Sequence, residues 1–124
     1  MRILLADDEV EILHIYSEML KGSGHAVTSV SNGREVLQWI DEKHDQFDLV
    51  IMDLYMPEMD GFQAIQVLRE KGYDIPIIVM TGHFPEEEVS DRLKGLNVGI
   101  SLRKPVLIST LLNAVHGVIG KKHK

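Results

Sequence analysis

Short apolar runs rich in β-branched residues alternate along this chain with longer segments of helical period, and this alternation constrains the fold more than any other feature. The apolar runs lie at residues 3–6, 26–30, 49–52, 77–80 and 98–102. Between them apolar residues recur at intervals of three and four, as on one face of an amphipathic helix. Five repeats of a strand followed by a helix indicate a doubly wound α/β domain, with a five-stranded parallel sheet between two layers of helices.

The strongest apolar run predicts a strand that is buried on both faces. Residues 49–52 do not alternate with polar residues, as is typical of a parallel sheet flanked by helices. Asn32 and Asp60 are suited to the starts of the second and third helices. The fourth helix offers few apolar residues, chiefly Val89 and Leu93, so we expect it to be weakly packed. Right-handed crossovers limit the possible topologies, but the alternation alone does not fix the order of the strands.

The composition excludes several classes of function. The 124 residues form one domain on the usual size range, with 13 basic and 19 acidic residues and a net charge of −6. This acidic balance argues against direct nucleic-acid binding, which requires clustered cations. The absence of cysteine excludes disulfides, thiolate zinc sites and iron–sulfur clusters, and it fits a reducing compartment. The six histidines show no metal-ligand spacing, and we interpret all except His83 as surface or helix residues.

No segment of the sequence predicts membrane insertion. The longest stretch without Asp, Glu, Lys or Arg, residues 105–120, is shorter than a bilayer span of about 20 residues and contains polar side chains. We therefore expect a soluble, cytoplasmic domain at residues 1–120. Residues 121–124 are expected to form a short basic tail.

Acidic, hydroxyl and basic residues follow the strong apolar runs where the predicted strands end. The first run is followed by Asp7 and Asp8, the third by Asp53 and the fourth by Thr81, and the fifth leads to Lys104. Ligands of open parallel sheets bind beyond the carboxyl ends of the strands. If these strands are neighbours, three carboxylates, a hydroxyl and an ammonium meet on one rim.

Such a rim has the parts for phosphoryl transfer. Three carboxylates at close range repel one another, so without a cation at least one should have a raised pKa. Oxygen ligands without imidazole or thiolate suit Mg²⁺ or Mn²⁺. The lysine and the threonine can hold phosphate oxygens, and a carboxylate can itself be the nucleophile that forms an aspartyl-phosphate.

At these positions the sequence resembles the receiver domain of two-component response regulators. The matching segments are residues 3–9 (ILLADDE), 49–61 (LVIMDLYMPEMDG), 79–82 (VMTG) and 103–105 (RKP). The resemblance covers nearly the whole chain, and the order and spacing of the segments make it specific. It implies a flavodoxin-like sheet with strand order 2-1-3-4-5.

The resemblance implies a role for each acidic residue of the rim. Asp53 would be the phosphoacceptor, taking a phosphoryl group from a histidine kinase or a histidine phosphotransfer protein. Mg²⁺, or Mn²⁺, would be bound by Asp8, Asp53 and the backbone carbonyl of Tyr55, with Asp7 acting through water. Such a domain catalyses its own phosphorylation and dephosphorylation but is not a turnover enzyme.

The resemblance also assigns the remaining residues of the rim. The Thr81 hydroxyl and the Lys104 ammonium would bind phosphoryl oxygens, and the peptide bond before Pro105 would be cis. Ser101 departs from the family, which commonly has an aromatic residue there that reports the phosphorylation state. The usual relay from threonine to aromatic residue is therefore not expected in this chain.

Two further positions tune the lifetime of the phosphoryl group in the family, and here they are Tyr55 and His83. We expect Tyr55 to shield the phosphoryl group from water, which dephosphorylation rates of Tyr55 variants would test.

By resemblance, the face formed by the fourth helix, fifth strand and fifth helix contacts partners, and the first helix meets the kinase or phosphotransfer protein. We expect a monomer or a weak homodimer.

Several alternatives remain open at this point. A stand-alone receiver is the leading interpretation, and an N-terminal receiver cut from a longer DNA-binding regulator or hybrid kinase is the second. A phosphohydrolase with an aspartyl nucleophile is less favoured because no substrate cap is present. A flavin-binding module is disfavoured because Asp7 and Asp8 would repel the flavin phosphate. The same two residues could instead simply cap the first helix.

Overall fold

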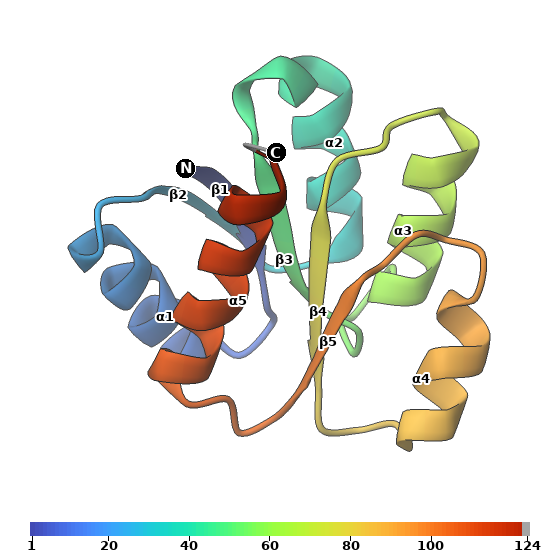
Figure 1. Ribbon diagram of the computed structural model, residues 1–124. Helices are drawn as coiled ribbons and strands as arrows, with labels where there is room; N and C mark the ends of the chain where they lie inside the picture. Colours follow the sequence, from blue (N-terminus) through green and yellow to red (C-terminus); the bar gives the residue numbers. More distant parts are fainter. Residues whose placement is uncertain (123–124) are drawn as a thin grey trace.

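The structure, a computed structural model, describes residues 1–122, with side chains as far as residue 118. Strands and helices alternate along the chain as predicted (Figure 1). The strands are β1 (Arg2–Ala6), β2 (Ala26–Val30), β3 (Leu49–Asp53), β4 (Ile77–Thr81) and β5 (Ile100–Arg103). The helices are α1 (Val10–Gly22), α2 (Gly33–Lys43), α3 (Gly61–Glu70), α4 (Glu86–Leu93) and α5 (Ile108–Lys122), with a 3-10 turn at His44–Gln46 before β3.

The five strands form one parallel sheet in the order β2-β1-β3-β4-β5, which confirms the order that the resemblance implied. Asp53 at the end of β3 pairs in register with Met80 of β4. Thr81 at the end of β4 pairs with Arg103 at the end of β5. The carboxyl ends of the strands therefore meet at one edge of the sheet, at the bottom of Figure 1, which we call the carboxyl edge.

Helices cover both faces of the sheet and create two hydrophobic layers. Leu49 and Ile51 of β3 point into the layer under α1 and α5. Val50 and Met52 of the same strand point into the layer under α2, α3 and α4. Residues 49–52 of β3 are buried, as the uninterrupted apolar run predicted, and Asp53 at the end of the strand is buried as well. Burial of each such aliphatic side chain contributes about 1.5–3 kcal/mol to folding.

Side-chain caps define where two of the helices begin. The Asn32 carboxamide oxygen accepts a hydrogen bond from the Glu35 N–H at 2.9 Å at the start of α2. Asp60 and Gln63 form a reciprocal capping box at the start of α3. Both helix starts were predicted from the sequence. They place α3 directly after the loop that follows Asp53.

The last strand begins later than predicted. The sequence pattern places a strand at 98–102, whereas β5 covers Ile100–Arg103. The reason is that Asn97 takes a left-handed backbone with φ of 56°, and Val98 packs against the layer under α4 instead of entering the sheet. The Arg69 guanidinium holds this loop by donating to the carbonyl oxygens of Leu96 and Asn97.

One histidine contradicts the interpretation of the histidines as surface or helix residues. His25, between α1 and β2, is only 8% exposed. Its Nδ1 lies 3.0 Å from the amino group of Met1, while its Nε2 is buried without a hydrogen-bond partner among the described residues. A single polar residue before a short strand carries no periodicity signal, so its burial could not be predicted from the pattern.

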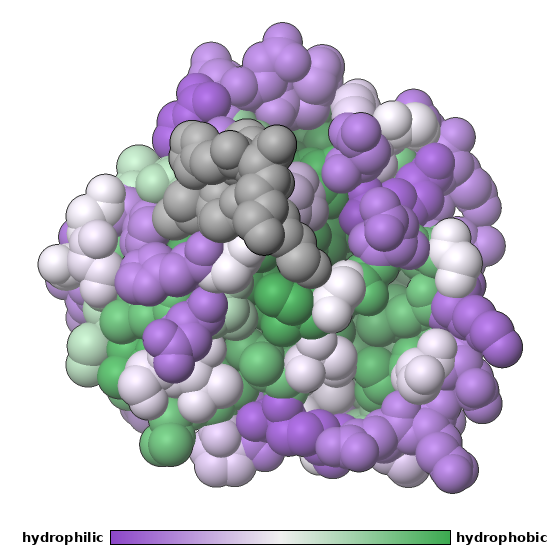
Figure 2. All heavy atoms as spheres, in the orientation of Figure 1, coloured by the Kyte–Doolittle hydropathy of each residue, from purple (hydrophilic) through white to green (hydrophobic). Residues whose placement is uncertain are grey.

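The predicted basic tail is only partly described. Helix α5 extends to Lys122, and the tail residues 123–124 lie outside the described part of the chain. None of the helices found in residues 1–122 combines the length and the apolar character that a bilayer crossing requires. On the viewed face, hydrophobic residues lie between α5 and α4, and hydrophilic side chains border them along the lower edge (Figure 2).

Candidate functional site

A buried carboxylate and an ammonium meet at the centre of the carboxyl edge. Asp53 is fully buried at the end of β3, and its Oδ2 lies 2.7 Å from the Lys104 Nζ. Its Oδ1 accepts a hydrogen bond from the Tyr55 N–H at 3.0 Å. The Lys104 N–H donates to the Thr81 carbonyl at 2.9 Å, which fixes the lysine beside the end of β4. One Asp53 oxygen thus faces a cation, and the other is held by the following loop.

Two acidic residues from the loop after β1 also contact this lysine. Asp7 is fully buried, with its Oδ2 2.6 Å from the Lys104 Nζ and its Oδ1 accepting from the Glu9 N–H at 2.9 Å. The exposed Glu9 carboxylate approaches the same ammonium at 3.4 Å. The N-cap of α1 is Glu9, which makes no side-chain capping bond. Capping of the first helix therefore does not account for Asp7 and Asp8.

Burial and pairing shift the pKa values of this cluster in opposite senses. Burial raises the pKa of the Asp7 carboxyl above its ordinary value of 3.8, although hydrogen bonding to Lys104 opposes the shift. The raised pKa was predicted, but burial rather than repulsion by Asp53 is its main cause. Burial disfavours the Lys104 ammonium, yet its hydrogen bonds to Asp53 and Asp7 outweigh this and raise its pKa. The lysine is therefore charged throughout the physiological pH range.

The acidic residues form a donor set that fits a hard divalent cation. Carboxylate oxygens of Asp7, Asp8, Glu9 and Asp53 lie within 4.8 Å of one another. A set made of oxygen atoms, with two buried carboxylates, suits Mg²⁺ or Mn²⁺ better than zinc. The predicted convergence of carboxylates from distant parts of the chain is confirmed, and it holds for Asp8 as well as for the buried pair.

The other residues expected at the site surround Asp53. Thr81 is buried at the end of β4, and its hydroxyl oxygen accepts a hydrogen bond from the His83 N–H at 3.2 Å. The peptide bond between Lys104 and Pro105 is cis, as the resemblance implied. This bond directly follows the residue whose ammonium contacts Asp53 and Asp7.

Tyr55 and His83 form a stacked pair at the rim of the site. Their ring centroids lie 4.2 Å apart with an interplanar angle of 14°. Tyr55 is about half exposed, at 52%. The two positions assigned to phosphoryl lifetime therefore contact each other directly.

The loop after Asp53 requires a glycine at the start of α3. A Cβ atom added to Gly61 would lie 2.7 Å from the Asp53 carbonyl oxygen and 2.8 Å from the Leu54 Cα. These contacts are with backbone atoms, which cannot move aside without displacing the end of β3. Gly61 therefore permits α3 to pack directly against the residue that carries the central carboxylate.

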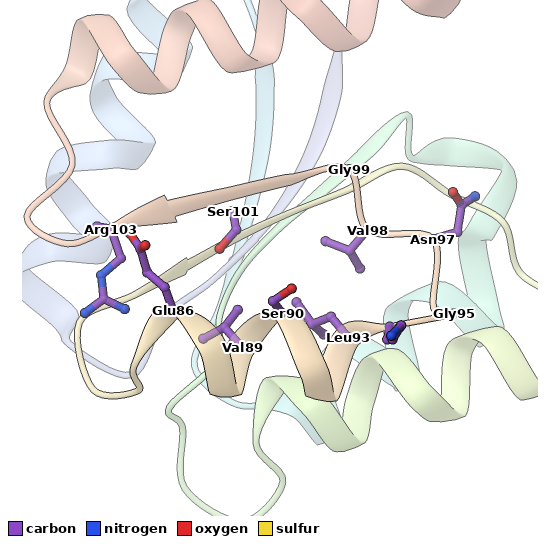
Figure 3. Close-up of a pocket in the computed structure, with 11 residues that line it drawn as sticks. Glu86, Val89, Ser90, Leu93, Gly95, Asn97, Val98, Gly99, Ser101 and Arg103 are labelled. Atoms are coloured by element: carbon purple, nitrogen blue, oxygen red, sulfur yellow. The ribbon is translucent and has the colours of Figure 1, made fainter.

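Ser101 lies outside this cluster, on the side of β5 that faces α4. It lines a groove of about 670 Å³ between α4 and β5. Its side chain points toward α4, across from Val89 (Figure 3). The groove is the space that a large side chain at position 101 would occupy in part.

Sequence reasoning gave no role to two features of the site. Glu9 belongs to the segment that carries the resemblance, and it is the third acidic residue to contact Lys104. The aromatic contacts around Tyr55, which extend to Phe62 and Phe84, were not predicted. Glu9 could have been noticed as a third consecutive acidic residue, whereas the ring contacts join separate segments and leave no local signal.

Comparison with known proteins gives a consistent family. A sequence model described as the response regulator receiver domain matches residues 3–116. The transcriptional regulatory protein TctD of Salmonella typhimurium is 35% identical over 113 residues, covering 90% of this chain and 48% of TctD. The two-component response regulator ARR10 of Arabidopsis thaliana is 33% identical over 123 residues, covering 98% of this chain and 22% of ARR10. The chain thus spans half or less of these curated relatives.

Solved structures agree with the sequence comparison. A response regulator receiver domain protein from Clostridium thermocellum superposes with a TM-score of 0.88 and 28% identity, covering 98% of this chain and 96% of that one. The shared fold, the matched family model and the acidic cluster at the carboxyl edge lead to the same assignment. The chain belongs to the response regulator receiver domain family.

Proposed function

We propose that this chain accepts a phosphoryl group on Asp53 from a phosphohistidine donor, which is a histidine kinase or a histidine phosphotransfer protein. The observation that carries the proposal is the pairing of the buried Asp53 carboxylate with the Lys104 ammonium at 2.7 Å inside an acidic cluster. Burying an unpaired carboxylate costs free energy. The buried Asp53 carboxylate is instead paired, and it lies at the edge where ligands of such sheets bind.

The transfer exchanges one bond to phosphorus for another. An Asp53 carboxylate oxygen attacks the phosphorus atom, the phosphorus–nitrogen bond of the donor breaks, and its electron pair returns to the imidazole. The product is an acyl phosphate on Asp53. Lys104 then pairs with a phosphoryl oxygen, and the Thr81 hydroxyl donates to another. The catalysis consists mostly of positioning and of charge neutralisation.

The residues that would hold Mg²⁺, or Mn²⁺, are Asp8, Asp53 and the carbonyl of Tyr55, with Asp7 acting through water. Bound there, the ion supplies positive charge to phosphoryl oxygens. Asp7 and Asp53 share the single Lys104 ammonium before transfer, so the site has more negative than positive charge among its described side chains. This excess negative charge supports the proposal of a cation.

Phosphorylation by a small donor tests the proposal. We expect incubation with acetyl phosphate and Mg²⁺ to add one phosphoryl group to the wild type, measured by intact mass. Asp53→Asn should add none, because it lacks the nucleophilic carboxylate. The matched control is Asp45→Asn, which removes an exposed carboxylate from the 3-10 turn before β3 and should be phosphorylated like the wild type. No mass gain in the wild type, or an equal gain in Asp53→Asn, would overturn the proposal.

We infer a signalling protein of the cytoplasm rather than a turnover enzyme, a nucleic-acid-binding domain or a membrane protein. The protein would be a monomer or a weak homodimer in solution. A stand-alone receiver remains the leading proposal. The second is an N-terminal receiver of a longer regulator, and the greater length of TctD favours this second proposal. The stop codon of the native reading frame decides between them. Catalytic turnover of a generic phosphate ester would instead favour the phosphohydrolase.

A further inference from the structure

Helix α4 packs against the rest of the domain through few buried residues. Among its residues only Val89 and Leu93 are buried. The groove that Ser101 lines separates the helix from β5 along much of its length (Figure 3). Ser101 is exposed and has only a hydroxymethyl group to extend across this space. Ser101 therefore does not join α4 to the phosphoacceptor region, and contacts that do so have to come from another side of the helix.

Such contacts exist on the side that faces α3. Four rings, those of Tyr55, Phe62, His83 and Phe84, form a continuous series that we call the ring cluster. His83 stacks on Tyr55, Tyr55 lies 6.2 Å from Phe84, and Phe84 meets Phe62 edge to face at 5.2 Å. The series ends on α4, where the Arg92 guanidinium lies 3.7 Å from the Phe62 ring centroid and 5.8 Å from that of Phe84.

At the opposite end of the ring cluster, the backbone N–H groups of two of its residues donate hydrogen bonds to the phosphoacceptor region. The Tyr55 N–H donates to the Asp53 Oδ1 at 3.0 Å. The His83 N–H donates to the Thr81 hydroxyl oxygen at 3.2 Å. Two members of the cluster thus contact the residues that would change their partners when Asp53 is phosphorylated.

We propose that the ring cluster couples the phosphorylation state of Asp53 to the position of α4, with Phe84 as the positioning residue at its centre. The inference rests on the proposed function, since it requires a phosphoryl group on Asp53. It extends that function by naming the side chains through which this chain, with Ser101 on β5, transmits the signal.

The coupling follows from contacts that differ between the two states. A phosphoryl group adds about −1.5 to −2 charge at Asp53. When the Thr81 hydroxyl turns to donate to a phosphoryl oxygen, its hydrogen bond with the His83 N–H changes. His83 and Phe84 are consecutive, and Pro85 leads directly into α4. A shift of this loop therefore moves the Phe84 ring against Phe62 and Arg92, which is the differential contact that a population shift needs.

A contact from β5 fixes the same loop from the other side. The Arg103 guanidinium donates a hydrogen bond to the Phe84 carbonyl oxygen. Arg103 also lines the groove between α4 and β5. Movement of Phe84 is therefore expected to alter the groove as well as the helix, although the groove holds no aromatic side chain of its own among its lining residues.

Amide hydrogen exchange in α4 tests this inference. Exchange is followed by mass spectrometry with and without acetyl phosphate and Mg²⁺, and the phosphorylated fraction is measured by intact mass. We expect phosphorylation to change the exchange rates of α4 amides in the wild type. In Phe84→Leu, which retains an apolar side chain, Asp53 should still be phosphorylated, but the change in α4 should be at least threefold smaller. Phe84→Tyr retains the ring and should preserve the response.

Two matched controls separate coupling from a general loss of packing. Phe47→Leu removes an aromatic ring that packs edge to face on Trp39, outside the ring cluster, and should leave the α4 response intact. Glu88→Gln removes the ion pair with Arg92 at 4.0 Å but leaves the guanidinium over Phe62, and should also leave it intact. A full α4 response in phosphorylated Phe84→Leu, or phosphorylation of the wild type without any α4 response, overturns the inference alone. No mass gain in the wild type overturns the proposed function and the inference with it.

Discussion

Two lysine–aspartate pairs of equal length lie in different surroundings in this molecule. The Lys104 Nζ is 2.7 Å from an Asp53 oxygen at the carboxyl edge, and the Lys71 Nζ is 2.7 Å from an Asp41 oxygen between α2 and the end of α3. The first pair has side-chain exposures of 9% and 0%, and the second has 45% and 39%. The two pairs have the same chemistry and distance, but the first is buried and its lysine also contacts Asp7 and Glu9.

The difference shows why only one of the pairs can form a reactive site. Hydrogen bonding to Lys71 lowers the pKa of the exposed Asp41 carboxyl, because solvent imposes little cost on its charge. At the carboxyl edge, burial raises the pKa of Asp7 despite its bond to Lys104. Buried charges depend on one another, whereas exposed pairs are screened by water and salt. The buried cluster therefore responds to any cation or phosphoryl group that enters it.

Removal of the buried ammonium should have the largest effect on stability. Lys104→Met keeps an unbranched side chain, one heavy atom shorter, but leaves Asp7 and Asp53 buried without their cation. We expect the free energy of unfolding in metal-free buffer to fall by about 3 kcal/mol, measured by urea denaturation. The loss should shrink at lower pH, where protonation of Asp7, with its raised pKa, removes a buried charge.

The matched variant for this prediction is Lys71→Met. It breaks a pair of the same length in solvent, so its unfolding midpoint should stay close to that of the wild type. Equal losses in the two variants would show that burial does not distinguish the pairs. A wild-type midpoint for Lys104→Met in metal-free buffer would contradict the dependence of Asp7 and Asp53 on this ammonium.

Metal binding should also distinguish the acidic cluster from exposed carboxylates. Mg²⁺ at ten times its dissociation constant should raise the free energy of unfolding of the wild type by about 1.4 kcal/mol, because it binds the folded acidic cluster. If Asp8→Asn weakens binding tenfold, the gain at the same concentration falls to about 0.4 kcal/mol. Removal of Mg²⁺ by a chelator should abolish both gains.

Asp45→Asn controls for a general effect of charge, since it removes an exposed carboxylate that is not part of the acidic cluster. Its gain with Mg²⁺ should equal that of the wild type. A gain in Asp8→Asn equal to that of the wild type would mean that the ion does not bind this residue. Equal losses in Asp8→Asn and Asp45→Asn would point to non-specific screening.

The fold could be predicted where side-chain period and burial coincide. Residues 49–52 gave a strand buried on both faces because every position of β3 contacts a hydrophobic layer. The start of β5 could not be placed, because Val98 has the composition of a strand residue but packs beside α4. The left-handed backbone of Asn97, which ends the connection, has no signature in hydrophobic periodicity.

The candidate site, like the fold, could be predicted from the sequence only in part. The convergence of Asp7, Asp53 and Lys104 followed from strand ends that share one edge, once the strand order was known. Burial could not be read from the residues themselves, so the main cause of the raised Asp7 pKa was missed. The contact between Phe62 and Phe84 depends on the packing of α3 against the loop before α4, which only coordinates reveal.

The smallest expected effect concerns a buried polar group away from the carboxyl edge. Burial lowers the pKa of His25 below its ordinary value of 6.5, and the neighbouring positive amino group of Met1 and the His116 ring act in the same direction. The unfolded state therefore binds more protons between the folded-state pKa and 6.5. The contribution of neutral His25 to stability is complete above pH 6.5 and is lost as the pH falls through this window.

His25→Leu should flatten this part of the pH dependence, measured by thermal denaturation from pH 7.5 to pH 5. His14→Leu, which removes an exposed histidine from α1, is the matched control. An unchanged slope in His25→Leu would mean that the charged form of His25 is accommodated in the fold. The His25 Nδ1 accepts from the positive amino group of Met1 at 3.0 Å, and protonation would replace this acceptor with an N–H that faces the ammonium, which argues against that outcome.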